Sequence, residues 1–242
     1  MKGSERNAMV LFGLAVTLGI LLFSTIAAAD PLNPLSKNII GSERGTVGGS
    51  PISIDAQAGN VTAVNINGEA LTTVWQGYYG NITGAITLEN AGGSVFYNWS
   101  DASPTGELYV ARVSSPTWAT VDCANLTHIT TEETALGITL NKVDGINETF
   151  SKSTHDAFSL GSRSFIANNC SFTTNGYNNA GPQSASWDEV LLYDSTSTAP
   201  VFATIIGQDS TAFNSGTVDF ETLIPVNTTQ TLTTYYFFVE LS

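Results

Sequence analysis

From Pro51 onward the sequence is a succession of short segments in which apolar and polar residues alternate, separated by turn residues. The segments are rich in Val, Ile, Thr and Tyr, with Gly, Asn and Pro between them, which is typical of β-strands joined by turns. Helical periodicity is poor, with one capped turn expected at Thr131–Leu136, and a parallel sheet would need crossover helices. The sequence therefore predicts an all-β fold, an antiparallel β-sandwich or jelly-roll-like domain over residues 51–242.

The expected strands follow one another closely along the chain. They read ISIDA, NVTAVNI, ALTTVWQG, NITGAITLE, SVFYNW, ELYVARVS, TWATVD, EVLLYD, PVFATIIG, DFETLI and TLTTYYFFVEL. The last is nearly continuous in apolar residues, which predicts a central strand covered on both faces. At about 190 residues the region fits one large sandwich, and two small domains are the alternative.

The first 29 residues have the pattern of an export signal. Lys2 and Arg6 precede a charge-free stretch of 22 residues, Ala8–Ala29, which ends in three alanines that suit a signal peptidase. The stretch is also long enough to span a bilayer, although Pro31 disfavours a longer helix. We expect an N-terminal apolar helix within residues 1–29, as a cleaved signal peptide or an uncleaved anchor, with cleavage favoured.

Both interpretations place the rest of the chain outside the cell membrane, because the positive charges precede the apolar stretch. Only residues 8–29 would contact a membrane, and only if they are not removed. Residues 30–50 follow with two prolines, four glycines and little periodicity, which predicts a tether. The expected localisation is extracellular, at the cell surface.

Charged residues are few, and most of them are acidic. The chain has 8 Lys and Arg against 21 Asp and Glu, a net charge of −13, which becomes −14 without residues 1–29. Such a chain would repel a polyanion, so nucleic acid is excluded as a partner.

Seven Asn-x-Ser/Thr sequons predict N-glycosylation of the exported chain, where chance alone would give roughly four. Because a glycan cannot be buried, we expect most of the acceptors at the surface. They are Asn60, Asn81, Asn98, Asn125, Asn147, Asn169 and Asn227.

The two cysteines, Cys123 and Cys170, both lie in the exported part. An even pair in an oxidising compartment predicts a disulfide. Two buried free thiols are the alternative.

The sequence has no recognisable catalytic or metal-binding motif, and we expect no enzyme and no required cofactor. His128 and His155 lie outside any ligand spacing, and there is no nucleophile elbow, P-loop or dinucleotide fingerprint. Adjacent acids, Glu132–Glu133 and Asp188–Glu189, would point to opposite faces of a strand. Acids distant in sequence could still meet in the fold, so a glycosidase is the enzymatic alternative.

One polar segment, NKVDGINETF at residues 141–150, carries the oxygen ligands that calcium prefers. It lacks the D-x-D-x-D-G order of an EF-hand loop, and a β-turn at Asp144–Gly145 with unusual backbone angles explains the same residues. The turn is the favoured interpretation and a calcium site the alternative. The candidate ligands are Asn141, Asp144, Asn147 and Glu148.

Aromatic side chains could stack on sugar rings or could simply fill the core. Trp75 with Tyr79, and Tyr97 with Trp99, are spaced to share one face of a straight strand. The segment SWDEVLLYD also has a faint resemblance to a strand of laminin-G-like lectin domains. The other candidates are Tyr78, Trp118, Trp187 and Tyr193.

Longer stretches resemble a group of proteins. WQGYYGNITGAITLENAGG, VDGINETF and VDFETLIPVN…TYYFFVEL are similar to uncharacterised exported surface proteins encoded in archaeal genomes, over most of Asn60–Leu241. This resemblance implies a cell-envelope β domain on a membrane-targeted leader, with no assigned reaction. The leader also resembles that of archaeal type IV pilins, although Glu5 is closer to the presumed cut than the family's acidic residue.

These observations lead to two hypotheses of function. The first is a structural or adhesive component of an archaeal cell surface, including a filament subunit, that binds copies of itself or other surface proteins and glycans. In this hypothesis Ser50–Ala56 donates a strand to a neighbour, and pairing within its own domain is the alternative. The second is a carbohydrate-binding, lectin-like module. An exposed aromatic row would favour the second hypothesis, whereas buried aromatics and an unpaired N-terminal strand would favour the first.

Overall fold

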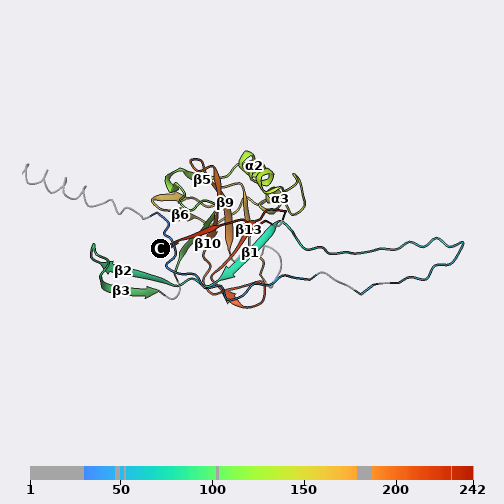
Figure 1. Ribbon diagram of the computed structural model, residues 1–242, viewed down its shortest axis with the longest axis horizontal. Coiled ribbons are helices and arrows are strands. Elements are labelled where there is room, and N and C mark those ends of the chain that lie inside the picture. Colours follow the sequence, from blue (N-terminus) through green and yellow to red (C-terminus); the bar gives the residue numbers. More distant parts are fainter. Residues whose placement is uncertain are drawn as a thin grey trace, which may run out of the picture.

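The computed structural model describes residues 30–46, 50–51, 53–101, 104–178, 187–229 and 231–241. The helix expected within residues 1–29 lies outside these ranges. None of the helices within them is long and apolar enough to cross a membrane. Figure 1 shows a body of packed strands and helices, from which a hairpin and the segment before β1 extend.

The body is built on a six-stranded antiparallel sheet. Its strand pairs, like all the others among the described residues, are antiparallel, and the chain is mostly β, which confirms the predicted class. Five of its strands follow the order β14 (Tyr236–Leu241), β4 (Gly106–Ala111), β10 (Ala199–Ile205), β9 (Asp188–Asp194) and β5 (Val121–Cys123). The sixth strand, β8 (Thr173–Asn175), pairs with β9, as β5 does.

Shorter elements surround this sheet. Four two-stranded pairs are β1 (Trp75–Gly80) with β13 (Phe220–Pro225), β2 (Gly84–Glu89) with β3 (Val95–Asp101), β6 (Phe158–Leu160) with β7 (Arg163–Phe165), and β11 (Ser210–Thr211) with β12 (Thr217–Val218). The helices within the described ranges are η1 (Trp118–Thr120), a 3₁₀ turn, and two α-helices, α2 (Leu126–Leu136) and α3 (Ile146–Thr149).

Alternate residues of the central strands belong to two apolar layers. Leu108, Leu191 and Phe202 pack in one cluster with residues of α2, α3 and β13. Tyr109, Leu192 and Val201 pack in another with the β6–β7 hairpin. Because successive side chains of a strand point to opposite faces, the central sheet is covered on both sides.

Helix α2 begins five residues before the predicted turn at Thr131–Leu136. Asn125 caps it, because its Oδ1 accepts from the His128 backbone N–H at 3.0 Å while the Asn125 N–H donates to His128 Nδ1 at 3.3 Å. Gly137, with φ of 69°, ends the helix in the left-handed conformation. The sequence did not indicate the first five residues of this helix, because His replaces the usual Glu or Gln of a capping box. Five of the eleven helical residues are also Thr or His, which are weak helix formers.

Strand β14 lies at the edge of the central sheet, so its predicted central position is wrong. Its apolar residues are explained by the two layers, since Phe237 packs in one and Phe238 in the other. On its outer side, Leu32 and Val239 exchange two backbone hydrogen bonds of 2.9 Å. The ladder cannot continue past this bridge, because Pro34 stands opposite Phe237 in the register and lacks an N–H.

Candidate functional site

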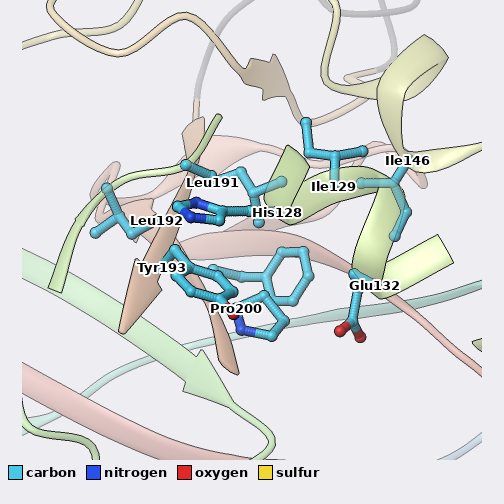
Figure 2. Close-up of a pocket in the computed structure, with 10 residues that line it drawn as sticks. His128, Ile129, Glu132, Ile146, Leu191, Leu192, Tyr193 and Pro200 are labelled. Carbon is cyan, nitrogen blue, oxygen red and sulfur yellow. The ribbon is translucent and has the colours of Figure 1, made fainter. Parts of the chain in front are cut away.

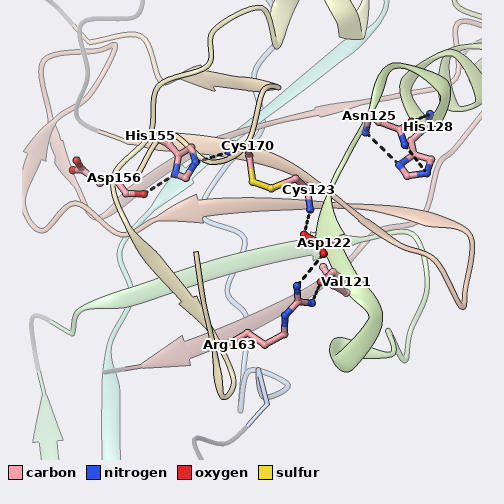
Figure 3. Close-up of a disulfide and its surroundings, with 9 residues drawn as sticks. All are labelled: Val121, Asp122, Cys123, Asn125, His128, His155, Asp156, Arg163 and Cys170. Atoms are coloured by element: carbon pink, nitrogen blue, oxygen red, sulfur yellow. Dashed lines mark hydrogen bonds and ion pairs between the residues drawn. A yellow bond between two sulfur atoms is a disulfide. The ribbon is translucent and has the colours of Figure 1, made fainter. Parts of the chain in front are cut away.

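Cys123 and Cys170 form the predicted disulfide (Figure 3), with their Cα atoms 5.3 Å apart. It joins the end of β5 to Cys170, a buried residue in the otherwise largely exposed segment between β7 and β8. Arg163 of β7 contacts the same edge strand, because its guanidinium lies 3.1 Å from the Asp122 carboxylate and donates to the Val121 carbonyl. One covalent and two polar contacts thus hold β5 and the β6–β7 region together.

All seven sequon asparagines lie at the surface, as predicted. Asn147 and Asn227 are half-buried, and the other five are exposed. None is a core residue, so the positions permit glycosylation, and their occupancy stays a prediction.

The calcium candidates lie around the start of α3, but their side chains contact different partners. The Asp144 carboxylate lies 3.0 Å from Lys142 Nζ and accepts from Thr72 Oγ1 at 2.7 Å. Asn147 donates instead to Glu148 Oε1 at 3.3 Å. Asn141 is exposed, and no cluster of three His, Cys, Asp or Glu suited to a metal is found in the described parts of the chain. The Lys142 ammonium group already compensates the negative charge of the Asp144 carboxylate, which weakens the calcium interpretation.

The predicted turn at Asp144–Gly145 has a different geometry. Gly145 has φ of −70° and precedes α3, whereas Asn141 holds the left-handed conformation with φ of 58°. Glycine is favoured at 145 for space, because a Cβ there would lie 2.9 Å from the backbone carbonyl oxygen of Lys142.

Glu133 organises this loop, although the sequence indicated it only as one of two adjacent acids. Its buried Oε1 accepts from the backbone N–H groups of Ile146 at 2.8 Å and Asn147 at 3.2 Å, which satisfies the start of α3. Glu132 turns instead to Arg112, at 2.5 Å. The two acids therefore point apart, but as neighbours on helix α2, which includes the predicted turn.

We expect Glu133→Ala to lower the free energy of unfolding by about 1–3 kcal/mol, because two buried backbone donors lose their acceptor. Urea unfolding followed by circular dichroism measures the change. Thr131→Ala, on the exposed side of the same helix, serves as the control and should change stability by less than about 0.5 kcal/mol. Equal effects of the two substitutions would contradict the capping role.

The two histidines have structural partners. His155 Nε2 accepts from the Cys170 backbone N–H at 3.0 Å. His128 stacks on Tyr193, with ring centroids 3.7 Å apart, and partial burial lowers its pKa. The rings of His128 and Tyr193 line a cavity between α2 and the sheet (Figure 2). At about 10 Å³ this cavity holds one water molecule at most and is too small for a substrate.

Two acids distant in sequence do meet in the fold. Glu107 and Glu240 are cross-strand neighbours on β4 and β14. Glu107 accepts from the Ser159 N–H at 3.0 Å, and Glu240 accepts from the Gly161 N–H at 2.9 Å. Burial, with a contribution from Glu240, raises the pKa of Glu107 to about 7. The pair supports the β6–β7 hairpin, and each carboxylate already has a backbone donor.

The chain before β1 has strand-like sequence but forms no strand in residues 53–73. The strands predicted as ISIDA and NVTAVNI are therefore wrong within this chain, although Ile52 lies outside the described residues. Ile54, Val61 and Ile66 are all exposed. In Figure 1 this segment runs far out from the body and returns to β1. No strand of the described residues lies beside this segment, so its backbone N–H and C=O groups have no strand with which to form hydrogen bonds.

The β2–β3 hairpin projects from the other side of the body (Figure 1). Asn90 shapes its turn, because its Oδ1 accepts from the N–H groups of Gly92 at 3.0 Å and Ser94 at 2.9 Å. Gly93 supplies the left-handed φ of 76°. At the base, Gly84 lies close to Leu241 of β14, since a Cβ at 84 would be 2.5 Å from Leu241 Cδ1.

The two faces of this hairpin differ in chemistry. Ile86 lies opposite Trp99 and Leu88 opposite Tyr97, so these four side chains share one side of the hairpin. We call these four residues the apolar hairpin face. Each is between 50% and 65% exposed. The other face carries Ala85, Thr87, the sequon residue Asn98 and Ser100, and a register shift at Leu88/Glu89 separates these pairs from the pair Glu89–Val95.

The remaining aromatic candidates are divided between core and surface. Tyr97 and Trp99 share a face as their spacing indicated, with ring centroids 4.6 Å apart. Trp187 is fully buried, and its Nε1 donates to the Asp219 carbonyl at 2.8 Å. Trp75 packs on Phe150. The other aromatic candidates are partly or fully exposed, namely Tyr78, Tyr79, Trp118 and Tyr193.

Comparisons with protein-family models, with curated proteins and with solved structures find no match for this chain. Two features of the described chain are exposed and have the composition of contact surfaces, namely the segment before β1 and the apolar hairpin face.

Proposed function

We propose that this chain is an extracellular structural or adhesive protein of the cell surface, which assembles with neighbouring copies by β-strand pairing, as in a filament. The observation that carries this proposal is the exposed, strand-like segment of residues 53–73, which forms no strand pairing with any described part of the chain. The export-type leader, the disulfide and the surface sequons support the extracellular location. The proposed architecture is a sandwich-like β domain preceded by an apolar helix within residues 1–29.

The segment has the properties of a donor strand. Val64 and Ile66 alternate with Asn65 and Asn67, so a strand here has one apolar and one polar face. An acceptor is available at the outer edge of β14, where the bridge to Leu32 is the only backbone pairing among the described residues. Strand addition would supply main-chain hydrogen bonds and would cover an edge that otherwise invites aggregation.

We expect the triple substitution Val61→Ser, Val64→Ser, Ile66→Ser to abolish assembly and leave a folded monomer, because these side chains contribute little to the core. Electron microscopy and light scattering of the chain without residues 1–29 would measure assembly, and circular dichroism would measure folding. The matched control changes three exposed tether residues, Leu35, Ile39 and Ile40, to serine and should assemble normally. A wild-type protein that stays monomeric at high concentration would contradict the proposed function.

A carbohydrate-binding module is the second candidate, favoured by the exposed Tyr97–Trp99 pair. Aromatic rings at a surface can stack on sugars, but specific sites also need polar groups that fix the hydroxyls. Tryptophan fluorescence titrations with polysaccharides, compared between the wild type and Trp99→Ser, would test this function. Saturable binding that the substitution removes would support the module over the assembly.

A further inference from the structure

The apolar hairpin face is a bare sheet surface of four large side chains, with no charged residue among them. A two-stranded hairpin alone is at best marginally stable in water and needs a packed face for stability. Here the base of the hairpin contacts Leu241 of β14, whereas every described residue from Ala85 to Ser100 is exposed. Contiguous exposed apolar surfaces of this kind mark interaction sites.

We propose that the apolar hairpin face docks onto the same face of a second copy, so that the two hairpins pack as a small two-layer sandwich. This inference rests on the proposed assembly and adds a second contact to it. Two-fold symmetry makes the contact self-complementary, because each copy presents the same flat sheet surface. Tyr97 and Trp99 are the residue types that dominate the energy of such interfaces.

Charge favours a second copy over a charged partner. The chain carries a net charge of −13, so copies repel one another over most of their surface. The apolar hairpin face is free of charge, and it lies on a projection away from the body (Figure 1), where a second copy meets the least electrostatic repulsion. A basic partner would instead be attracted to the acidic surface of the body.

The opposite face of the hairpin has a different role. Asn98, in the sequon, lies there opposite Thr87. A glycan at Asn98 would keep this side solvated and would leave only the apolar face for contact. The apolar face also lacks the carboxylate and amide groups that orient sugar hydroxyls, which disfavours a sugar as its occupant.

The size of the face indicates the strength of the contact. With roughly 150–250 Å² for a whole aromatic side chain and somewhat less for Ile or Leu, four half-exposed residues offer on the order of 300–400 Å² per copy. A standard interface buries about 800 Å² per partner. The hairpin contact is therefore reversible by itself, and a stable assembly needs strand pairing in addition.

A single introduced cysteine tests the proposed geometry. Both native cysteines are joined to each other, so Leu88→Cys would carry the only free thiol of the chain. Because Leu88 lies on the apolar hairpin face, mild oxidation should cross-link two copies at least tenfold faster than for Thr87→Cys, on the opposite face. Non-reducing gels measure the rates. Equal rates for the two variants would overturn the face-to-face contact.

A second pair of variants separates this inference from the proposed function. Trp99→Ser should weaken self-association at least tenfold in sedimentation experiments, whereas Thr87→Ala, at an exposed position of the other face, should not. If Trp99→Ser assembles like the wild type, the hairpin contact is wrong and assembly by strand donation stands. If the wild type is monomeric throughout, both proposals are wrong. Loss of polysaccharide binding without any wild-type dimer would identify the face as a sugar platform and would also overturn the contact.

Discussion

Replacement of both Cys123 and Cys170 by alanine is expected to lower the free energy of unfolding by about 4 kcal/mol. The disulfide closes a loop with 46 residues between the cysteines, and the chain-entropy model gives this magnitude for such a loop. Loss of the buried Cys170 sulfur adds a small packing term. Urea unfolding of the oxidised wild type and of the double variant measures the difference, which corresponds to roughly 10 °C in melting temperature.

Arg163→Met is the matched control for this experiment. It removes the two polar contacts of β7 with β5 and leaves the disulfide in place. We expect it to cost about 1 kcal/mol, because the ion pair to Asp122 is largely exposed. If the double alanine variant loses less than the arginine variant does, the disulfide is not the principal link between β5 and the β6–β7 region.

The central sheet could be predicted from sequence because its strands obey a local rule. In β4, β9 and β10 the buried residues alternate between two covered faces, and the segments ELYVARVS, EVLLYD and PVFATIIG show it as apolar runs. The position of β14 could not be predicted, because an edge strand with two covered faces has the same composition as a central one. The prediction of strands before β1 was wrong for the opposite reason, since the pattern there is that of a strand but the residues that the structure describes offer no partner strand beside it.

The candidate site was predictable only in part. The spacing of Tyr97 and Trp99 predicted that they share a face, because successive side chains of a strand alternate. Nothing local distinguishes them from Trp187, which is buried, since exposure depends on which elements pack over each strand. The buried acids were missed for the same reason. Glu189, for example, accepts from Leu223, 34 residues away.

Stability is expected to rise as the pH falls from about 8 to 5. Burial raises the pKa of Glu107 and Glu132 to about 7 and that of Glu189 to about 8, from an ordinary value of 4.5. Between these values the folded chain binds more protons than the unfolded chain, so stability falls as the pH rises through the folded-state pKa values. Asp144 and Asp194 have lowered pKa values, so their stabilisation is lost at strongly acidic pH.

Glu189 should be the largest single contributor to this pH dependence. It is buried between β9 and β13, where it accepts from Thr222 Oγ1 at 2.6 Å and from the Leu223 N–H at 2.9 Å. Ionisation of a carboxyl group in this position costs about 3 kcal/mol between pH 5 and pH 8, because each unit of pKa shift corresponds to about 1.4 kcal/mol.

Glu189→Gln tests this assignment, because glutamine keeps an acceptor oxygen and removes the charge. We expect the variant to be more stable relative to the wild type at pH 8 than at pH 5, with a flatter dependence of the unfolding free energy on pH. Glu89→Gln, at an exposed position of the hairpin, should leave the wild-type profile unchanged, since that carboxylate stays solvated after folding. Thermal and urea unfolding at pH 5, 6, 7 and 8 measure both profiles. A wild-type stability that rises toward pH 8, or an unchanged slope in Glu189→Gln, would show that the buried carboxyl groups ionise without cost and that their backbone donors outweigh desolvation.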